Sequence, residues 1–305
     1  MSAATYCLED PCARSVARQT SPLHEYAHLR DESAMFVTGY RRIAEHEFRL
    51  CASWPASPGE LAYEPRVLVQ TVRQCGLIVA HAEYGVPLTH QTLLHNMNFT
   101  MRPALHDFRD APSSLDIRTV VSDTRRPGRA TDMLRMDFQI LRAGAVVAGA
   151  DLEFAWISPR AYRRLRGAQL DVVWGDWPLP APADPGLVGR STDDDVVLAA
   201  DGAPNRWLLR NDIRDRMLFD HAVDHVPGAV LLEAADQAAR ALLAPRHFVP
   251  FGLTSNFSQY VEFDSPCSIR AEPLPDPGHN QVAVLISGTQ DGESAFTVEL
   301  TGTTC

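Results

Sequence analysis

The stretch FDHAVDHVPGAVLLEAADQ, residues 219–237, joins a polar loop rich in His and Asp to an almost wholly apolar helical segment. Pro227 fits the start of a helix, because its φ is already helical and it has no N–H group to leave unsatisfied there. Gly228 lets another backbone or a ligand approach the helix end closely. The free N–H groups of that end suit a carbonyl oxygen that gains negative charge. We therefore expect this segment to hold and polarise an acyl group.

The composition of the chain limits the classes of function to which it can belong. Its 305 residues predict about two domains, and 45% hydrophobic residues are enough for buried cores. All 28 basic residues are arginines, and the absence of lysine excludes Schiff-base chemistry and a Walker-type phosphate loop. A net charge of −10 argues against a nucleic-acid partner, because a phosphate backbone binds a basic face.

The six cysteines are scattered along the chain and form no Cys-x-x-Cys pair, so neither a structural zinc site nor a redox dithiol is indicated. Residues 1–19 lack the apolar core of a signal peptide. The longest run of small apolar residues, 143–150, is too short to cross a bilayer. We expect a cytoplasmic protein with free thiols, no membrane contact, no metal and no cofactor.

The chain divides into two halves that resemble each other. Residues 167–195 are rich in Pro, Gly and Asp and are predicted to link a first domain, 24–166, to a second, 196–305. When the first half is shifted by 163 positions, six residues coincide without a gap: Val67 with Val230, Leu68 with Leu231, Gln74 with Gln237, Val86 and Pro87 with Val249 and Pro250, and Pro103 with Pro266. Each set follows the order of apolar helix, Val-Pro turn, strand and proline, which indicates an internal duplication.

Each half combines one long apolar segment with several strand-like segments. Residues 65–84 and 227–243 are apolar on nearly every side, as expected for a helix enclosed by protein. Strands are predicted over 92–101, 117–123, 133–141 and 146–156 in the first half, and over 256–263, 281–288 and 295–301 in the second. A buried helix followed by antiparallel strands predicts an α+β fold in which a sheet wraps around one helix. This is the hotdog architecture, present here as a tandem pair.

Both helical segments carry polar residues at spacings of three and four, which share one helix face. These polar stripes are Gln70, Arg73 and Gln74 in the first half, and Glu233, Asp236 and Gln237 in the second, at the same offset of 163. Buried polar groups need partners. One interpretation is a structural ion pair between Arg73 and Glu233 or Asp236 where the halves meet. The other is that both stripes line a shared acyl pocket, with Gln74 and Gln237 among its substrate-binding residues, and the two are compatible.

Glu233 is the best candidate for a general acid or base. It lies on the helix whose first residues, Gly228 and Ala229, would hold the carbonyl, and its apolar neighbours should raise its pKa. We expect the loop residues His221 and His225 to contact substrate or to order the loop, His225 being nearer the helix end. Their spacing would suit a metal on a helix, but the Pro-Gly that follows argues against a helix there.

A cluster of arginines follows the first half, at positions 160, 163, 164 and 166. On an acidic protein this patch could bind an acidic carrier protein or a phosphorylated substrate. It could equally be a solvated surface segment, and the sequence leaves both interpretations open.

Several of these motifs resemble one known family. DHAVDHVPGAVLLEA at 220–234 resembles the second-half signature of the A-factor synthase family, also called AfsA-type. LVQTVRQ at 68–74, with His81 and YGVP at 84–87, is similar to the family's first repeat, and YRRLR at 162–166 is similar to the end of that repeat. The resemblance covers most of residues 24–305 and implies a tandem hotdog fold.

The resemblance also implies an activity. Members of the family join a β-ketoacyl group from an acyl-carrier-protein thioester to the hydroxyl of dihydroxyacetone phosphate, towards butyrolactone, butenolide or furan signalling molecules. The reaction needs a polarised carbonyl, a base near the attacking hydroxyl and a cation for the phosphate. Here Gly228 and Ala229 would hold the carbonyl, Glu233 would activate the hydroxyl, and Arg73 would bind the phosphate.

The sequence departs from the family pattern at two positions, because the pattern places Glu where Gln70 stands and Arg where Asp236 stands, a pair to which catalysis is assigned. Either Glu233 and Arg73 take over the acid–base and anion-binding roles, or the reaction differs. The alternatives are a hotdog dehydratase or thioesterase that acts on carrier-bound acyl thioesters, and a non-catalytic acyl-binding protein. The duplication allows a monomer or a homodimer, since the two halves can form the usual hotdog pair within one chain.

Overall fold

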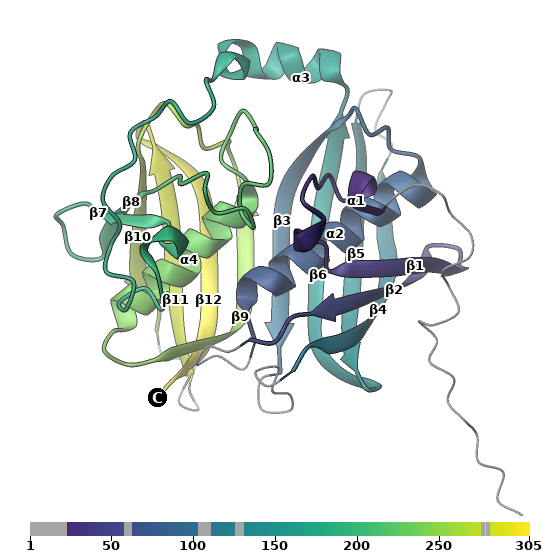
Figure 1. Cartoon of the computed structure of the whole chain (residues 1–305), viewed down its shortest axis with the longest axis horizontal. Helices are drawn as coiled ribbons and strands as arrows, with labels where there is room; N and C mark the ends of the chain where they lie inside the picture. The colour runs from purple at the N-terminus through teal and green to yellow at the C-terminus, as the bar shows by residue number, and fades with distance from the viewer. Residues whose placement is uncertain (1–22, 58–62, 103–110, 126–130, 276–277, 279–280) are drawn as a thin grey trace, which may run out of the picture.

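The structure, a computed structural model, describes residues 23–57, 63–102, 111–125, 131–275, 278 and 281–305. Within them twelve strands form one antiparallel sheet in the order β1-β2-β4-β5-β6-β3-β9-β12-β11-β10-β8-β7. The strands are β1 (Val37–Ala44), β2 (Glu47–Trp54), β3 (Gln91–Met101), β4 (Ser113–Arg125), β5 (Thr131–Arg142), β6 (Ala145–Ile157), β7 (Leu198–Ala200), β8 (Arg206–Leu209), β9 (Phe248–Phe257), β10 (Cys267–Pro273), β11 (Gln281–Gln290) and β12 (Glu293–Thr304). The two halves of the chain therefore meet edge to edge at β3 and β9 (Figure 1).

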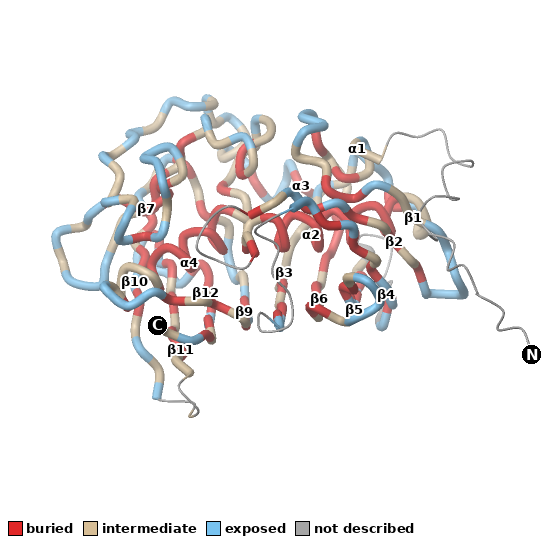
Figure 2. Tube along the Cα trace, turned by 60° about the horizontal axis from the view of Figure 1, so that its bottom comes forward, coloured by how far each residue is buried: buried red, intermediate tan, exposed pale blue. Residues whose placement is uncertain are grey.

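A long helix lies against the sheet in each half, and Figure 2 shows that buried residues run along both helices. Helix α2 (Pro65–Tyr84) starts where the Glu64 side chain accepts a hydrogen bond from the Arg66 N–H, and ends at Gly85 in the left-handed conformation. Helix α4 (Gly228–Leu243) starts after Pro227. The shorter elements are α1 (Leu23–Tyr26), α3 (Pro159–Arg166) and the 3-10 turns η1 (Glu32–Ala34), η3 (Gly167–Asp171) and η4 (Asp193–Asp195).

The predicted α+β tandem fold is confirmed, and both predicted helices form within a residue of their expected bounds. The four strands predicted in the first half correspond to β3, β4, β5 and β6, and the last two of the second half to β11 and β12. Strands β1, β2, β7, β8 and β10 were not predicted, and most of β9 was missed as well.

The strand predicted over 256–263 is wrong, because β9 begins at Phe248 and ends at Phe257. Val249 and Pro250 lie inside this strand, so the Val-Pro turn expected from the duplication does not form in the second half. Pro250 pairs with Gly302 next to a register shift in β12, which is a place where a strand tolerates a residue without an N–H. Pro103, the last residue used to align the halves, lies outside the described residues.

The segment 167–195, predicted to be a linker, packs on the second half. The Trp177 ring stacks on Phe263 with 4.1 Å between centroids, and its Nε1 donates to the Asn211 carbonyl at 2.9 Å. Trp174 meets Phe219 and Phe263 edge-on. The segment thus adds aromatic side chains to the second core.

Cys75 and Cys267 are buried free thiols and Cys305 is an exposed one, whereas Cys51 is disulfide-bonded, so the expectation of free thiols is wrong at that position. Burial raises the pKa of Cys75, and raises that of Cys267 to about 12. Among the helices of the described residues, none combines the length and the apolar character needed to cross a membrane.

Candidate active site

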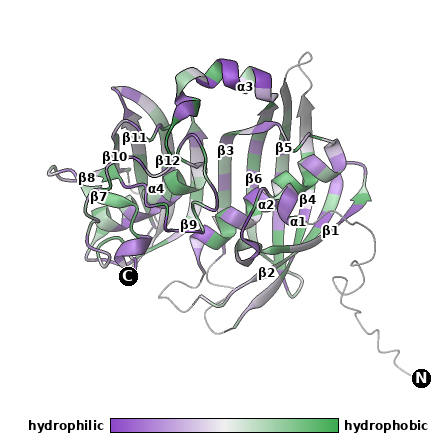
Figure 3. Ribbon diagram, turned by 45° about the horizontal axis from the view of Figure 1, so that its top comes forward, coloured by the Kyte–Doolittle hydropathy of each residue, from purple (hydrophilic) through white to green (hydrophobic). Residues whose placement is uncertain are grey.

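A cavity of about 1180 Å³ lies between the two halves, and its lining is more apolar than polar. Its walls come from α2, β3, the loop 217–227 and the first turn of α4. Helix α3 spans the tops of both halves (Figures 1 and 3) and contributes Tyr162, Arg163 and Leu165 to the lining. A cavity of this size and character can take a long acyl chain.

The start of α4 faces this cavity with free backbone donors. Gly228 and Ala229 line the cavity, and no side chain caps the helix. Within the described part of the chain, the N–H groups of these two residues have no hydrogen-bond acceptor. A Cβ at Gly228 would lie 3.0 Å from Leu94 Cδ2, so a side chain there would narrow the approach. The positive end of the helix is therefore available to a developing oxyanion.

Two residues of the first polar stripe, Gln70 and Arg73, line the same cavity. Gln70 donates from Nε2 to the Met217 carbonyl at 2.8 Å, while its buried Oε1 has no partner among the described residues. Arg73 donates to the Ala27 carbonyl at 3.2 Å and, in the described chain, forms no ion pair with a carboxylate. Burial lowers the pKa of Arg73 to about 10, although Asp220 opposes this. The cavity therefore contains a desolvated cation that no carboxylate of the described chain contacts directly, which is suited to an anionic ligand.

Gln74 and Gln237, predicted to bind substrate, lie outside the cavity and hold backbone instead. Gln74 accepts from the N–H groups of Phe36 and Val37 and donates to the Ala34 carbonyl, at 2.8–3.1 Å. Gln237 accepts from the Val197 N–H at 3.0 Å and donates to the Asp195 carbonyl at 2.8 Å. The two glutamines thus have equivalent structural roles, since Gln74 fixes the segment that leads into β1 and Gln237 fixes the segment that leads into β7.

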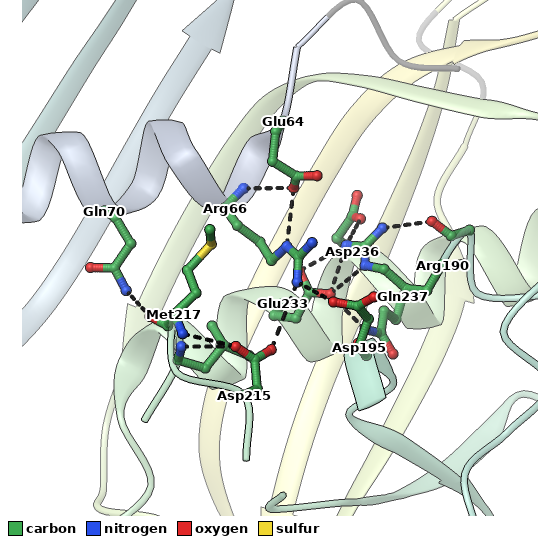
Figure 4. A network of polar contacts seen from close by, with 12 residues as sticks. Glu64, Arg66, Gln70, Arg190, Asp195, Asp215, Met217, Glu233, Asp236 and Gln237 are labelled. Atoms are coloured by element: carbon green, nitrogen blue, oxygen red, sulfur yellow. Dashed lines mark hydrogen bonds and ion pairs between the residues drawn. The ribbon is translucent and has the colours of Figure 1, made fainter. Parts of the chain in front are cut away.

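Glu233 and Asp236, the other two residues predicted to be catalytic, belong to a buried ion-pair network apart from the large cavity (Figure 4). Glu233 accepts two hydrogen bonds from Arg190, at 2.7 and 2.8 Å. Asp236 accepts from Arg190 at 3.0 Å and from Arg240 at 2.8 Å. Burial raises the pKa of Glu233 against the pull of Arg190, whereas Arg240 and Arg190 overcome burial and lower the pKa of Asp236. The expected ion pair exists, but its cation is Arg190 and not Arg73.

The two sites are related by the duplication, because each helix start faces the polar stripe of the other helix. The large cavity joins the start of α4 to Gln70 and Arg73 of α2. A pocket of about 20 Å³, with room for about one water molecule, joins Arg66 at the start of α2 to Glu233 and Asp236 of α4. The equivalent second site is therefore filled by charged side chains. Sequence periodicity identified both stripes, but it did not show that Glu233 faces the small pocket, whereas Gln70 and Arg73 face the large cavity.

Two Asp–His pairs lie in the loop that precedes α4, and all four residues line the cavity. Asp220 Oδ2 lies 3.0 Å from His221 Nδ1, and Asp224 Oδ1 lies 3.0 Å from His225 Nδ1. The backbone N–H groups of residues 30 and 31 donate to Asp220 at 2.7 and 2.8 Å. The structure thus brings both predicted loop histidines to the cavity, each oriented by the preceding aspartate.

Asp224 is the centre of a second polar cluster. It accepts hydrogen bonds from the Tyr162 hydroxyl and from Arg166 Nε, each at 2.7 Å. Arg166 also pairs with Glu262 and lies over the Tyr260 ring, 4.2 Å from its centroid. Hydrogen bonds from His225, Arg166 and Tyr162 outweigh burial and hold the pKa of Asp224 well below its usual range. This cluster ties α3 to the loop before α4.

The arginine cluster predicted as one patch is therefore divided. Arg166 is 6% exposed and serves the Asp224 cluster. Arg160, Arg163 and Arg164 remain exposed on α3, and Arg163 also lines the cavity.

A histidine that the sequence did not single out, His28, also lines the cavity. Its Nε2 lies 2.7 Å from His81 Nε2, and His81 Nδ1 lies 2.7 Å from the Val86 carbonyl. Because a carbonyl only accepts, His81 donates from Nδ1, and His28 donates from Nε2 to His81. His28 therefore directs its other nitrogen away from this chain of hydrogen bonds.

Arg190 was also missed in the sequence analysis. The signal for it was indirect, because two carboxylates on a buried helix face require a cation.

The fold and the site define a tandem hotdog protein with an acyl-sized cavity between its halves. A family model described as "A-factor biosynthesis hotdog domain" matches residues 19–158 and 175–305, and the chain belongs to this family. It is 39% identical over 277 residues to a 2-oxo-3-(phosphooxy)propyl 3-oxoalkanoate synthase of Streptomyces virginiae, covering 89% of this chain and 94% of that one. A synthase of the same name from Streptomyces griseus is 31% identical over 284 residues, covering 91% and 94%.

Solved structures show the same fold at low sequence identity. A 12:0-ACP thioesterase from Umbellularia californica is similar with a TM-score of 0.55 and 9% identity, covering 87% of this chain and 100% of that one. An acyl-ACP thioesterase from Bacteroides thetaiotaomicron VPI-5482 is similar with a TM-score of 0.50 and 12% identity, covering 83% and 97%. At such identities the likeness concerns the fold alone.

Proposed function

We propose that this protein is an acyltransferase that joins a β-ketoacyl group, carried as an acyl-carrier-protein thioester, to dihydroxyacetone phosphate. The observation that carries the proposal is the meeting, in one apolar cavity, of an uncapped helix start with a half-buried arginine that no carboxylate of the described chain contacts directly. The name of the relatives describes the matching ester, since its 2-oxo-3-(phosphooxy)propyl part derives from dihydroxyacetone phosphate and its 3-oxoalkanoate part is the β-ketoacyl group.

Each substrate has a suitable place in the cavity. The N–H groups of Gly228 and Ala229 would stabilise the oxyanion that forms when the thioester carbonyl is attacked. Arg73 would bind the phosphate, because a guanidinium is matched to phosphate oxygens and this one is already desolvated. The free Oε1 of Gln70 can accept a hydrogen bond from a hydroxyl of the acceptor.

Helix α3 supports the proposal that the acyl donor is bound to a carrier protein. Its exposed residues Arg160, Arg163 and Arg164 form a basic segment on a chain of net charge −10. Arg163 also lines the cavity, so an acidic carrier bound at α3 would deliver its acyl arm directly into it. The ester product would lead to a butyrolactone-, butenolide- or furan-type signalling molecule. Glu233 is assigned a structural role in this scheme, because Arg190 holds it outside the cavity.

Mass spectrometry of reactions with a panel of β-ketoacyl thioesters tests the proposal. We expect the phosphorylated ester to form with dihydroxyacetone phosphate and much less readily with unphosphorylated dihydroxyacetone. Arg73→Gln should raise the KM for dihydroxyacetone phosphate by about 10- to 100-fold, because a charge-assisted contact is lost, and should abolish the preference for the phosphorylated acceptor.

Arg270→Gln is the matched control, since Arg270 lies on β10 with a side chain that is 62% exposed. It should leave both kinetic constants unchanged. If the rate of thioester turnover is the same with and without dihydroxyacetone phosphate, the result would contradict the proposal and favour a thioesterase or dehydratase. Tight acyl binding without turnover would favour a non-catalytic role.

A further inference from the structure

The proposed reaction needs a base near the attacking hydroxyl, and Glu233 lies outside the cavity. Imidazoles from three parts of the chain line the cavity: His28 before η1, His90 and His95 around the start of β3, and His221 and His225 before α4. Of these, His221 and His225 each lie within hydrogen-bond distance of a carboxylate in the described structure. A carboxylate on one nitrogen fixes the tautomer and leaves the other nitrogen as an acceptor, which is what a general base requires.

We propose that His221 is the general base of the acyl transfer and that Asp220 is its positioning residue, a proposal that rests on the proposed function. Asp220 is held from behind by the backbone N–H groups of Arg30 and Asp31, so its orientation is set before substrate binds. Its side chain is 8% exposed and that of His221 is 27% exposed, as expected for a buried carboxylate behind an accessible imidazole. His221 lines the cavity, and the contact of Asp220 with Nδ1 leaves Nε2 as the nitrogen available to substrate.

His225 is less suited to this role because its carboxylate is already neutralised. Asp224 accepts from Arg166 Nε at 2.7 Å and from the Tyr162 hydroxyl at 2.7 Å, as well as from His225. In contrast, no arginine lies within ion-pair distance of Asp220 in the described chain. An aspartate that no arginine contacts directly stabilises an imidazolium more strongly than one that arginine already neutralises.

His28 is unsuited for a different reason. Its ring donates to His81, and burial together with the neighbouring His81, Arg73 and His221 lowers its pKa to about 4. It is therefore a weak base at neutral pH. The charged and titratable groups around His221 are Asp220 on its own loop, Asp31 and His28 from the N-terminal segment, and Arg73 from α2.

The location of the pair suits a small acceptor that carries both a hydroxyl and a phosphate. Asp220 acts electrostatically on Arg73, and both His221 and Arg73 act on His28, so the base and the cation share one corner of the cavity. A phosphate bound at Arg73 would thus place the far hydroxyl of the same molecule towards His221.

The step balances within the two substrates. His221 Nε2 removes the hydroxyl proton of dihydroxyacetone phosphate as its oxygen forms a bond to the thioester carbonyl carbon. The carbonyl electron pair moves to the oxygen, which the N–H groups of Gly228 and Ala229 stabilise. When the carbonyl re-forms, the C–S bond breaks, and the His221 imidazolium returns the proton to the carrier thiolate. The products are the ester and the free thiol.

The test is chemical rescue in the full chain. His221→Ala should lower kcat by about 10²- to 10⁴-fold with little change in the KM for dihydroxyacetone phosphate, and added imidazole should restore part of the rate. The acidic limb of the kcat/KM profile against pH should disappear in this variant. Asp220→Asn should lower kcat by about 10- to 100-fold and move that limb, because an amide keeps the size of the carboxylate and one of its two acceptor oxygens but cannot stabilise an imidazolium.

His221→Gln, whose amide can still donate to Asp220, controls for misfolding and should be as slow as the alanine variant while unfolding in urea like the unchanged protein. His247→Ala is the control for loss of a histidine elsewhere. His247 is exposed and follows the C-terminal end of α4, so this variant should keep the full rate. Full activity of His221→Ala, or a loss that imidazole does not rescue with the acidic limb intact, would overturn the assignment while leaving the proposed function standing. If the unchanged protein forms no ester, the proposed function fails, and this inference fails with it.

Discussion

At the scale of single residues, the paired imidazoles of His28 and His81 determine how the cavity wall responds to acid. Their Nε2 atoms lie 2.7 Å apart, and one hydrogen bond can form between them only while at least one ring is neutral. Burial is the largest cause that lowers the pKa of each ring, for His28 from 6.5 to about 4. The unfolded chain therefore binds a proton at His28 in a pH range in which the folded chain does not.

We predict that this difference destabilises the protein as the pH falls. The contribution of His28 is fully present above pH 6.5 and is lost as the pH falls towards about 4, because only the unfolded state is protonated in that window. After allowance for the partial exposure of the ring, the loss is on the order of 1–2 kcal/mol. His28→Gln, whose amide can still donate to His81, should lose less free energy of unfolding than the unchanged protein between pH 7 and pH 4.5.

Urea unfolding at the two pH values measures this difference, and the many other acid-sensitive groups cancel because both proteins share them. Equal losses in the two proteins would show that His28 does not remain neutral in the folded state.

Sequence periodicity was sufficient to find Gln70 and Arg73, because polar residues three apart on an apolar helix share a face that must meet something polar. It was insufficient for Glu233 and Asp236. The spacing defines a helix face, but the cavity that this face meets depends on how two helices pack across the sheet. That packing brings the start of α4 to Gln70 and Arg73 in the large cavity, and brings Arg66 of α2 to Glu233 and Asp236 in the small pocket.

At the scale of elements, α4 depends on the segment 167–195 for its charge balance. Arg190 comes from this segment and forms hydrogen bonds with both Glu233 and Asp236, and all three side chains are at most 5% exposed. Composition predicted a linker here, because Pro and Gly prevent regular structure. Composition carries no information on whether an irregular segment packs, and so Arg190 was missed.

We predict that Arg190→Met lowers the free energy of unfolding by about 3–5 kcal/mol, because among the described residues Asp236 then keeps only Arg240 as a contacting cation and buried Glu233 keeps only the hydrogen bond from Gln237. Adding Glu233→Gln should recover part of the loss, since it removes the uncompensated charge. A double-mutant cycle in urea gives the coupling energy, which we expect to be about 1–3 kcal/mol. Strictly additive effects would contradict the assigned ion pair.

Some strands could be predicted from the sequence and others could not. Central strands such as β6 and β11 were predicted from their apolar runs, whereas edge strands such as β1, with seven exposed or half-exposed residues in sequence, lack that signal. β9 was displaced because Pro250 was interpreted as a turn. Its tolerance inside the strand comes from a register shift in β12, which is a property of the pairing and not of the local sequence.

At the scale of the whole molecule, the halves are joined by a narrow seam. β3 and β9 pair through Phe99 with Leu253 and Thr100 with Gly252. Beyond these pairs Ser255 completes the seam, because its hydroxyl accepts from the Met97 N–H at 2.9 Å and donates to the Met97 carbonyl at 2.7 Å. Ser255 is 4% exposed, so these groups have no access to bulk water as a replacement.

We predict that Ser255→Ala lowers the free energy of unfolding by about 2 kcal/mol, because it leaves a buried N–H and a buried carbonyl unsatisfied. Ser258→Ala is the matched control: its hydroxyl donates to the carbonyl groups of residues 294 and 295 at an exposed position, and its effect should stay within about 0.5 kcal/mol. Thermal or urea unfolding of both variants, each compared with the unchanged protein, measures the two losses of stability. Equal stabilities would show that the seam does not depend on the Ser255 hydroxyl.

The filled pocket around Arg66, Glu233 and Asp236 has a consequence for how this chain can evolve. In a symmetric pair of identical subunits, any substitution in one site appears in the other as well. Here the equivalent positions are encoded separately, so residues 190, 233 and 236 can change while Arg73 of the large cavity stays the same, although the pocket and the cavity share walls such as Gln70 and Ala229. Directed evolution of acyl specificity can therefore vary the lining of the large cavity alone, while exchanges of charge in the pocket provide an independent means of adjusting stability.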